Sequence, residues 1–186
     1  LAGDGTPGSK CLIARNPTAI TSGQLTLATG PVTGDTAGGG GGQVAGGSRC
    51  TVIPDSQLKV IPGTGGMKLI TAAADNFIRM RADAARAGVT IALDSAYRTP
   101  QRGEEIWVEH RCRVGNGCRG AVCAVNGPAA VPCSLGCGSN HQTGVAIDVT
   151  YSGRAVEWVT ANGGPYGFVH DPNWNADLHH FSQTGR

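Results

Sequence analysis

The sequence is poor in aromatic residues, in long apolar runs and in any excess of charge of one sign. Aromatic residues make up 5% of the 186 positions, and no apolar run approaches the roughly 18 residues that a membrane helix needs. With 15 basic and 13 acidic side chains, the net charge is +2. So small an excess gives no signal for a nucleic-acid partner or an anionic membrane surface, and we expect neither.

Cysteine and glycine, by contrast, are abundant, with seven Cys and 30 Gly. Seven thiols in a chain of 18.9 kDa would be a liability in a reducing cytosol, so the sequence predicts a secreted protein, extracellular or periplasmic, with disulfides. The chain begins at Leu1 without a signal segment, which fits a mature form or an excised fragment. Nothing in the sequence indicates more than a monomer.

Residues 1–66 differ from the rest of the chain, because they hold few charges and include five successive glycines at 38–42. Five glycines favour a flexible loop or linker. We interpret residues 1–66 as a Gly-rich N-terminal extension that either belongs to the fold or precedes it, and residues 67–186 as the core. Cys11 and Cys50 flank the glycine run, and a bridge between them would fasten the base of this loop to the domain. The sequence alone does not choose the disulfide pairing of the seven cysteines.

Apolar periodicity after residue 67 predicts helices alternating with strands. Helical spacing of apolar residues indicates a helix over 67–87 that ends at Gly88, and alternation indicates a strand over 89–94. The other predicted elements are helices at 104–110 and 154–162 and strands at 24–28, 51–53, 145–151, 166–169 and 178–181. We therefore expect an α+β fold, with a small, mainly antiparallel sheet, packed helices and disulfide stabilisation.

Residues 112–138 interrupt this pattern as an insert with five cysteines. Their spacing lacks the paired Cys-x-x-Cys of structural zinc sites, so we expect disulfide packing rather than a zinc knuckle. Because the insert leads directly into Ser139, we expect it to form a wall of the active-site cleft.

Two groups of titratable residues point to a metal. His141 and Asp148 lie seven positions apart, and Asp177, His179 and His180 follow near the C-terminus. Two His and one Asp form the ligand set of a catalytic zinc site that leaves a fourth position open for water. Spacing alone does not choose between His179 and His180.

Asp148 lies within an apolar run, so it needs a strong partner. On a strand, Asp148 shares a face with Ala146, while Ile147 lies on the opposite face. An unpaired buried carboxylate is very costly. The alternative to a metal is a salt bridge from Asp148 to Arg98 or Arg154.

The run Ser139-x-His141-x-x-Gly144-x-Ala146-x-Asp148 resembles the signature of the D-Ala-D-Ala metallopeptidases. This family comprises VanY-like carboxypeptidases and related phage endolysins, in a wider group that includes lysostaphin-type enzymes and the hedgehog signalling domain. Two further segments, residues 94–101 and 158–168, are similar to the family's Ser-Gly-Tyr-Arg-Ser segment and to its approach to the final zinc His. The resemblance covers about residues 67–181 and implies a hedgehog/D,D-peptidase-like fold.

The resemblance also implies the roles of the site residues. His141, Asp148 and His180 would bind one Zn²⁺ per chain, and Asp177 would be the catalytic base that takes a proton from a zinc-activated water. Arg98 would hold a substrate carboxylate or the developing oxyanion. The implied substrates are peptidoglycan stem or cross-link peptides that contain D-amino acids, cut as by a D-Ala-D-Ala carboxypeptidase or endopeptidase.

The chain departs from the family's usual Glu-x-Trp-His ending, since it reads Asp177-Leu178-His179-His180. Asp in this place resembles the L-Ala–D-Glu endopeptidases among phage lysins, which leaves the bond that is cut open. A non-catalytic zinc-containing binding module is the alternative outside enzymes. His179, Ser139 and Gln101 are further candidates for substrate contact, and His110 and His170 are interpreted as surface residues.

Overall fold

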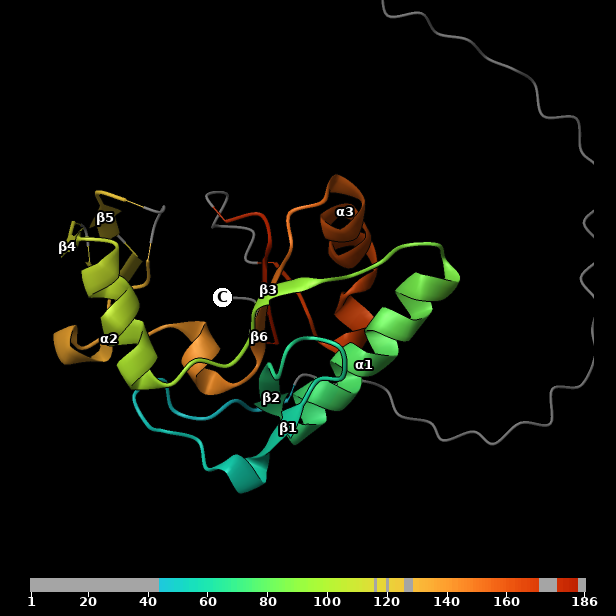
Figure 1. The fold of residues 1–186 in the computed structure, drawn as a ribbon, viewed down its shortest axis with the longest axis horizontal. Coiled ribbons are helices and arrows are strands. Elements are labelled where there is room, and N and C mark those ends of the chain that lie inside the picture. The colour runs from blue at the N-terminus through green and yellow to red at the C-terminus, as the bar shows by residue number, and fades with distance from the viewer. Residues whose placement is uncertain (1–43, 116, 120, 126–128, 171–176, 184–186) are drawn as a thin grey trace, which may run out of the picture. The chain divides into compact units, whose positions relative to one another are not determined.

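A computed structural model describes residues 44–115, 117–119, 121–125, 129–170 and 177–183. The glycine run at 38–42, the predicted strand at 24–28 and Cys11 lie outside these ranges. The described part contains three α-helices and three small antiparallel sheets, which confirms the predicted α+β fold. In Figure 1, α1 and α3 lie on one side of strands β3 and β6, and α2 lies on the other side with β4 and β5.

The central sheet has the strand order β3 (Leu93–Ser95), β6 (Ala146–Val149) and β7 (His180–Ser182), and both pairings are antiparallel. Asp148 on the middle strand is in register with Ser95 on one side and with His180 on the other. Side chains directly opposite on neighbouring strands share one face of a sheet. The register therefore places these three side chains in a row.

Two further antiparallel pairs lie outside this sheet, one before β3 in the sequence and one between β3 and β6. Strand β1 (Leu58–Val60) pairs with β2 (Lys68–Ile70), and β4 (Cys112–Val114) pairs with β5 (Ala121–Cys123). The pairing of Lys68–Ile70 explains why the first helix begins later than residue 67. These residues are extended because they hydrogen-bond to β1.

Helix α1 spans Thr71–Arg86, and the chain leaves it at Gly88, which has a φ of +73°. Helix α2 spans Pro100–Glu109 and so begins four residues earlier than predicted. Thr99 caps it by accepting a hydrogen bond from the Arg102 N–H at 3.1 Å, and a proline suits the first helical position. Helix α3 (Gly153–Asn162) agrees with the predicted helix to within one residue.

Some predicted strands are shorter or absent. Residues 51–53 form no strand, and within 89–94 only Leu93 and Asp94 belong to β3. The segment 166–169 begins in a 3-10 turn that ends at Gly167, whose φ is +84°, and pairs only through a bridge between Val169 and Ser182. A turn of that kind interrupts the extended backbone that its apolar residues would otherwise favour.

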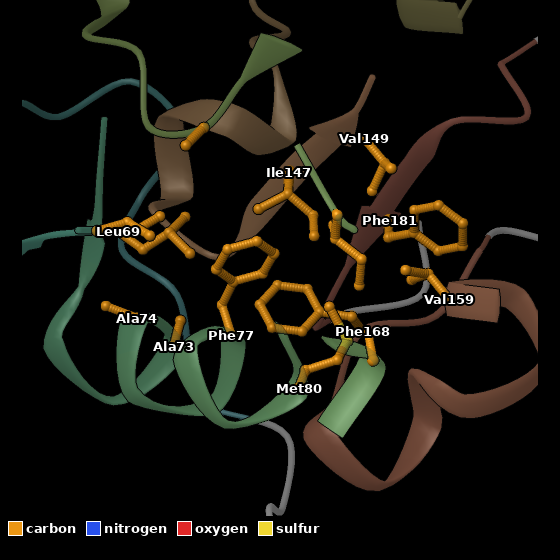
Figure 2. Packing of buried hydrophobic residues seen from close by; sticks show 14 of the residues in the cluster. Leu69, Ala73, Ala74, Phe77, Met80, Ile147, Val149, Val159, Phe168 and Phe181 are labelled. Atoms are coloured by element: carbon orange, nitrogen blue, oxygen red, sulfur yellow. The ribbon is translucent and has the colours of Figure 1, made fainter. Parts of the chain in front are cut away.

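The hydrophobic core lies between α1 and the central sheet (Figure 2). Phe77 and Phe168 meet edge to face with ring centroids 6.0 Å apart, and both are fully buried. Burying such a side chain contributes about 1.5–3 kcal/mol. Ile147 and Val149 of β6 are also fully buried in this core. Strand alternation then turns the side chain of Asp148 to the opposite face.

Three disulfides connect the described cysteines: Cys50–Cys133, Cys112–Cys123 and Cys118–Cys137. The pairing of Cys50 with Cys133 rules out the Cys11–Cys50 bridge considered from the sequence. The Cα atoms of Cys50 and Cys133 lie 5.5 Å apart, a usual separation for a disulfide, although 83 positions separate them in the sequence. All five cysteines of the insert are bonded, which agrees with disulfide packing rather than a zinc knuckle.

Candidate metal centre

Asp148 is the centre of a cluster that joins three distant parts of the chain. Its Oδ1 lies 3.1 Å from His141 Nε2 and 2.9 Å from His180 Nδ1. One nitrogen of each imidazole and one carboxylate oxygen all lie within 4.8 Å of one another. The structure thus brings His141, Asp148 and His180 together. His179 belongs instead to a second group of possible metal ligands, with Asp148 and Asp177.

A short capped turn positions His141. The residue lies in a 3-10 helix, Asn140–Thr143, whose first turn is closed by a capping box between Ser139 and Gln142. Gly144 ends this turn with a φ of +72°, and a Cβ there would lie 2.7 Å from the Ile70 side chain. Only glycine combines this backbone conformation with so close an approach, so the turn places His141 at the mouth of β6.

The hydrogen bond of the His141 Nδ1 atom determines which tautomer the ring adopts. Nδ1 lies 2.7 Å from the Ala96 carbonyl oxygen, which can only accept, so Nδ1 carries a hydrogen. Burial lowers the pKa of His141, whose side chain is 2% exposed, and so favours the neutral ring. The Nε2 lone pair of that ring then faces the carboxylate oxygen at 3.1 Å. A cation between the two atoms removes this repulsion, which is the arrangement of a metal ligand held by an outer hydrogen bond.

Asp148 stays ionised in the folded protein. Burial alone would raise the pKa of its carboxyl, but the two imidazoles beside it, His141 and His180, outweigh burial and hold that pKa well below its ordinary value. A permanent carboxylate between two imidazoles is a set of one O and two N donors, which suits Zn²⁺. The residues present therefore fit the metal that the sequence resemblance implies.

Arg98 adds a positive charge at the edge of this cluster. Its Nη2 lies 3.7 Å from Asp148 Oδ2, and its backbone N–H donates to the His141 carbonyl at 3.2 Å. Burial lowers the pKa of Arg98, but the ordinary pKa of an arginine is so far above neutrality that the guanidinium keeps its charge at neutral pH. Of the two arginines weighed as partners of Asp148, Arg98 is thus the one in contact, while Arg154 lies exposed on α3.

A small pocket opens beside Arg98. Its polar lining is Arg98, Ser139 and Gln142, and its other walls are Gly103, Ile106, Ala129, Ala130 and Pro132. Arg98 Nε and Gln142 Nε2 are buried and donate no hydrogen bond to the described residues. The insert supplies Ala129, Ala130 and Pro132, and so borders the site. Two unpaired N–H donors in one pocket call for an acceptor such as a carboxylate or carbonyl oxygen.

Asp177 lies in a turn just before β7, closed by the His180 N–H donating to the Asp177 carbonyl at 3.2 Å. This turn allows Asp177 and His180 to approach Asp148 from the same side, which a continuous strand would prevent. His179 Nδ1 lies 3.3 Å from Asp177 Oδ1. His170 donates through Nε2 to the Asp177 carbonyl oxygen at 3.0 Å, so it is a partner of the site rather than an isolated surface residue.

Gln101 is not brought into the cluster. It lies on the exposed side of α2, where its Nε2 donates to Glu105 at 3.2 Å. Gln142 and His170 were missed as site residues in the sequence. Gln142 occupies a variable position inside the matched motif, and His170 reaches Asp177 only through a backbone carbonyl. Neither contact leaves a pattern in the sequence.

A family model described as VanY, D-alanyl-D-alanine carboxypeptidase, matches residues 66–183. No curated protein sequence matches the chain. Among solved structures, VanYB in complex with D-alanine-D-alanine is 18% identical, with 75% of this chain and 84% of that chain covered and a TM-score of 0.52, which shows a shared fold.

Two other solved structures are similar to the chain at lower TM-scores. One is a mutant of the vancomycin resistance D,D-pentapeptidase VanY from a VanB-type cassette in complex with Zn(II), at 16% identity, 75% and 86% coverage and a TM-score of 0.48. The other is the LdcB LD-carboxypeptidase, at 22% identity, 68% and 67% coverage and a TM-score of 0.46.

Proposed function

Because the chain belongs to the VanY family of D-alanyl-D-alanine carboxypeptidases, we propose that it is a zinc peptidase that hydrolyses peptidoglycan peptide bonds involving D-amino acids. The observation that carries this proposal is the convergence of His141, Asp148 and His180 on one point, with a second carboxylate, Asp177, beside it. One Zn²⁺ per chain would be held by His141 Nε2, Asp148 and His180 Nδ1. Bound there, zinc lowers the pKa of a coordinated water to about 7 and polarises the scissile carbonyl.

Asp177 is the proton acceptor in this proposal. Its carboxylate oxygen lies within 4.8 Å of an oxygen of Asp148, so it borders the point where the attacking water would bind. Asp177 takes the proton of that water and delivers it to the leaving amine, a role that typically contributes 10²- to 10⁴-fold in rate.

Arg98, with the pocket beside it, binds the substrate. The buried N–H groups of Arg98 and Gln142 are placed to donate to a terminal carboxylate, with Ser139 as a third polar group. If the scissile carbonyl binds nearer to Asp148, the guanidinium instead stabilises the oxyanion.

The proposed location is secreted, outside the reducing cytosol, where peptidoglycan lies. The three disulfides support this, since such bonds persist in oxidising compartments. Among the described residues, no helix has the length and apolar character to cross a membrane. We also propose that the catalytic core begins near residue 67, with residues 1–66 as an extension whose described part is integrated into the fold through β1 and the Cys50–Cys133 bridge.

The test combines zinc content and digestion of muropeptides on one preparation, with and without a chelator. We expect one zinc per chain and chelator-sensitive cleavage, and mass spectrometry of the products identifies the bond. Loss of one alanine indicates a D,D-carboxypeptidase, loss of cross-links an endopeptidase, and release of the stem an L-Ala–D-Glu peptidase, which Asp177 in place of Glu favours.

Asp177→Asn is the decisive variant, because it keeps the shape of the side chain and removes the proton acceptor. We expect it to retain zinc and to lose turnover by at least about 100-fold. Asp75→Asn is the matched control, since Asp75 forms only an exposed ion pair with Lys59. Zinc without cleavage in the wild type would instead identify a binding module and refute the proposed function.

A further inference from the structure

Asp177 has a shorter reach than a glutamate, so its position needs to be well fixed if it is to accept a proton from water. Two histidines contact it at opposite ends. His179 Nδ1 lies 3.3 Å from the carboxylate oxygen Oδ1, and His170 Nε2 donates to the backbone carbonyl at 3.0 Å. Neither histidine belongs to the group proposed to bind zinc.

We propose that His179 and His170 are positioning residues for Asp177. His179 orients the carboxylate, and His170 holds the turn that carries it. This inference rests on the proposed function, because it gives both histidines a role only if Asp177 is the base.

The surroundings of Asp177 Oδ1 support the role of His179. This oxygen is buried and accepts no aligned hydrogen bond from the described residues, so the Nδ1 contact at 3.3 Å supplies a donor where one is needed. Catalytic hydrogen bonds are often long in a free enzyme and tighten when substrate binds.

Each of the two rings also contacts a neighbouring aromatic side chain. His179 meets Tyr151 edge to face with centroids 6.4 Å apart, and its carbonyl accepts from the Val149 N–H at 3.0 Å. His170 meets Phe181 edge to face at 6.0 Å, and Phe181 is fully buried next to His180.

The chemistry defines one tautomer for each histidine. His170 needs a hydrogen on Nε2, because a carbonyl oxygen only accepts, and His179 needs one on Nδ1 to face a carboxylate. Both conditions are met by neutral rings. Asparagine reproduces the donor at the Nδ1 position and glutamine reproduces the donor at Nε2, which gives a conservative replacement for each residue.

The kinetic test compares a variant that keeps the donor with one that keeps only the ring. We expect His179→Phe to lower kcat about 10- to 100-fold with KM and zinc content unchanged, the range typical of groups that orient a reactive residue. We expect His179→Asn to recover most of this loss. His170→Phe and His170→Gln should behave as a parallel pair.

The alternative role for His179 is a direct contact with substrate, which is open to it because its side chain is 36% exposed. This role predicts a change in KM rather than in kcat. In that case His179→Phe would raise KM and leave kcat near the wild-type value, which would overturn the positioning role. Loss of zinc in His179→Phe, or equal loss in the Phe and Asn variants, would also overturn it.

A second measurement does not depend on activity. Nitrogen-15 NMR of the imidazoles in metal-free protein should show the Nδ1–H tautomer for His179 and the Nε2–H tautomer for His170. Asp177→Ala should remove the preference at His179 and leave that at His170. If the wild-type protein shows no cleavage but both tautomers are as expected, the proposed function fails while the contacts of His179 and His170 with Asp177 are confirmed. If His179 carries its hydrogen on Nε2 instead, the inference itself is refuted.

Discussion

Removal of the Cys50–Cys133 bridge should cost more stability than removal of any bridge inside the insert. This bridge closes a loop over a sequence separation of 83, and the Cys112–Cys123 bridge closes one over 11. The chain-entropy relation gives about 4.5 kcal/mol for the long loop and about 2.8 kcal/mol for the short one. The difference of about 1.7 kcal/mol depends only on loop length, since both changes remove the same covalent bond.

The assay is urea unfolding at neutral pH, in the presence of a chelator, of Cys50→Ser/Cys133→Ser and of Cys112→Ser/Cys123→Ser. The chelator is needed because a metal that binds only the folded chain would add its own stabilisation. We expect both double variants to be destabilised, and the first more strongly. An equal or larger loss in the Cys112/Cys123 variant would refute the reasoning from loop length.

Other predictions concern the site. Gly144→Ala should destabilise the protein by about 2–5 kcal/mol, from the left-handed backbone and the contact with Ile70, measured by thermal unfolding. Gly103→Ala places a Cβ 2.5 Å from the end of the flexible Gln142 side chain, so we expect a raised KM with stability within about 1 kcal/mol of wild type. Burial lowers the pKa of His141, so below about pH 6.5 the unfolded chain binds a proton that the folded chain does not. Stability of the metal-free protein should therefore fall from pH 7 to pH 5 in urea titrations, and less so in His141→Asn.

The sequence predicted the parts of the fold that depend on local periodicity. Alternation within residues 145–151 identified the strand that carries Asp148, and helical spacing identified the helices at 71–86 and 153–162. Boundaries were less accurate where a distant partner decided the backbone. Lys68–Ile70 looks helical in sequence but is extended, because it pairs with β1.

The cluster of His141, Asp148 and His180 was expected from a resemblance and not from spacing, which left His179 and His180 equivalent. The turn at Asp177, visible only in the structure, distinguishes them. The Cys50–Cys133 pair had no signal at all, because proximity along the chain favoured Cys11 while the fold brings Cys133 near. Contacts across 83 positions depend on the whole topology, and no local pattern records them.

The division of the site between a central and an outer strand has a consequence for local unfolding. Asp148 lies on β6, which is paired on both sides, whereas His180 lies on β7 and Asp177 in the turn before it. Outer strands open more readily than central ones, in fluctuations far smaller than global unfolding. A single opening of β7 therefore displaces a proposed ligand and the proposed base in one event. The proposed site is therefore assembled or dismantled as a unit, and a partly opened molecule retains only the pair of His141 and Asp148.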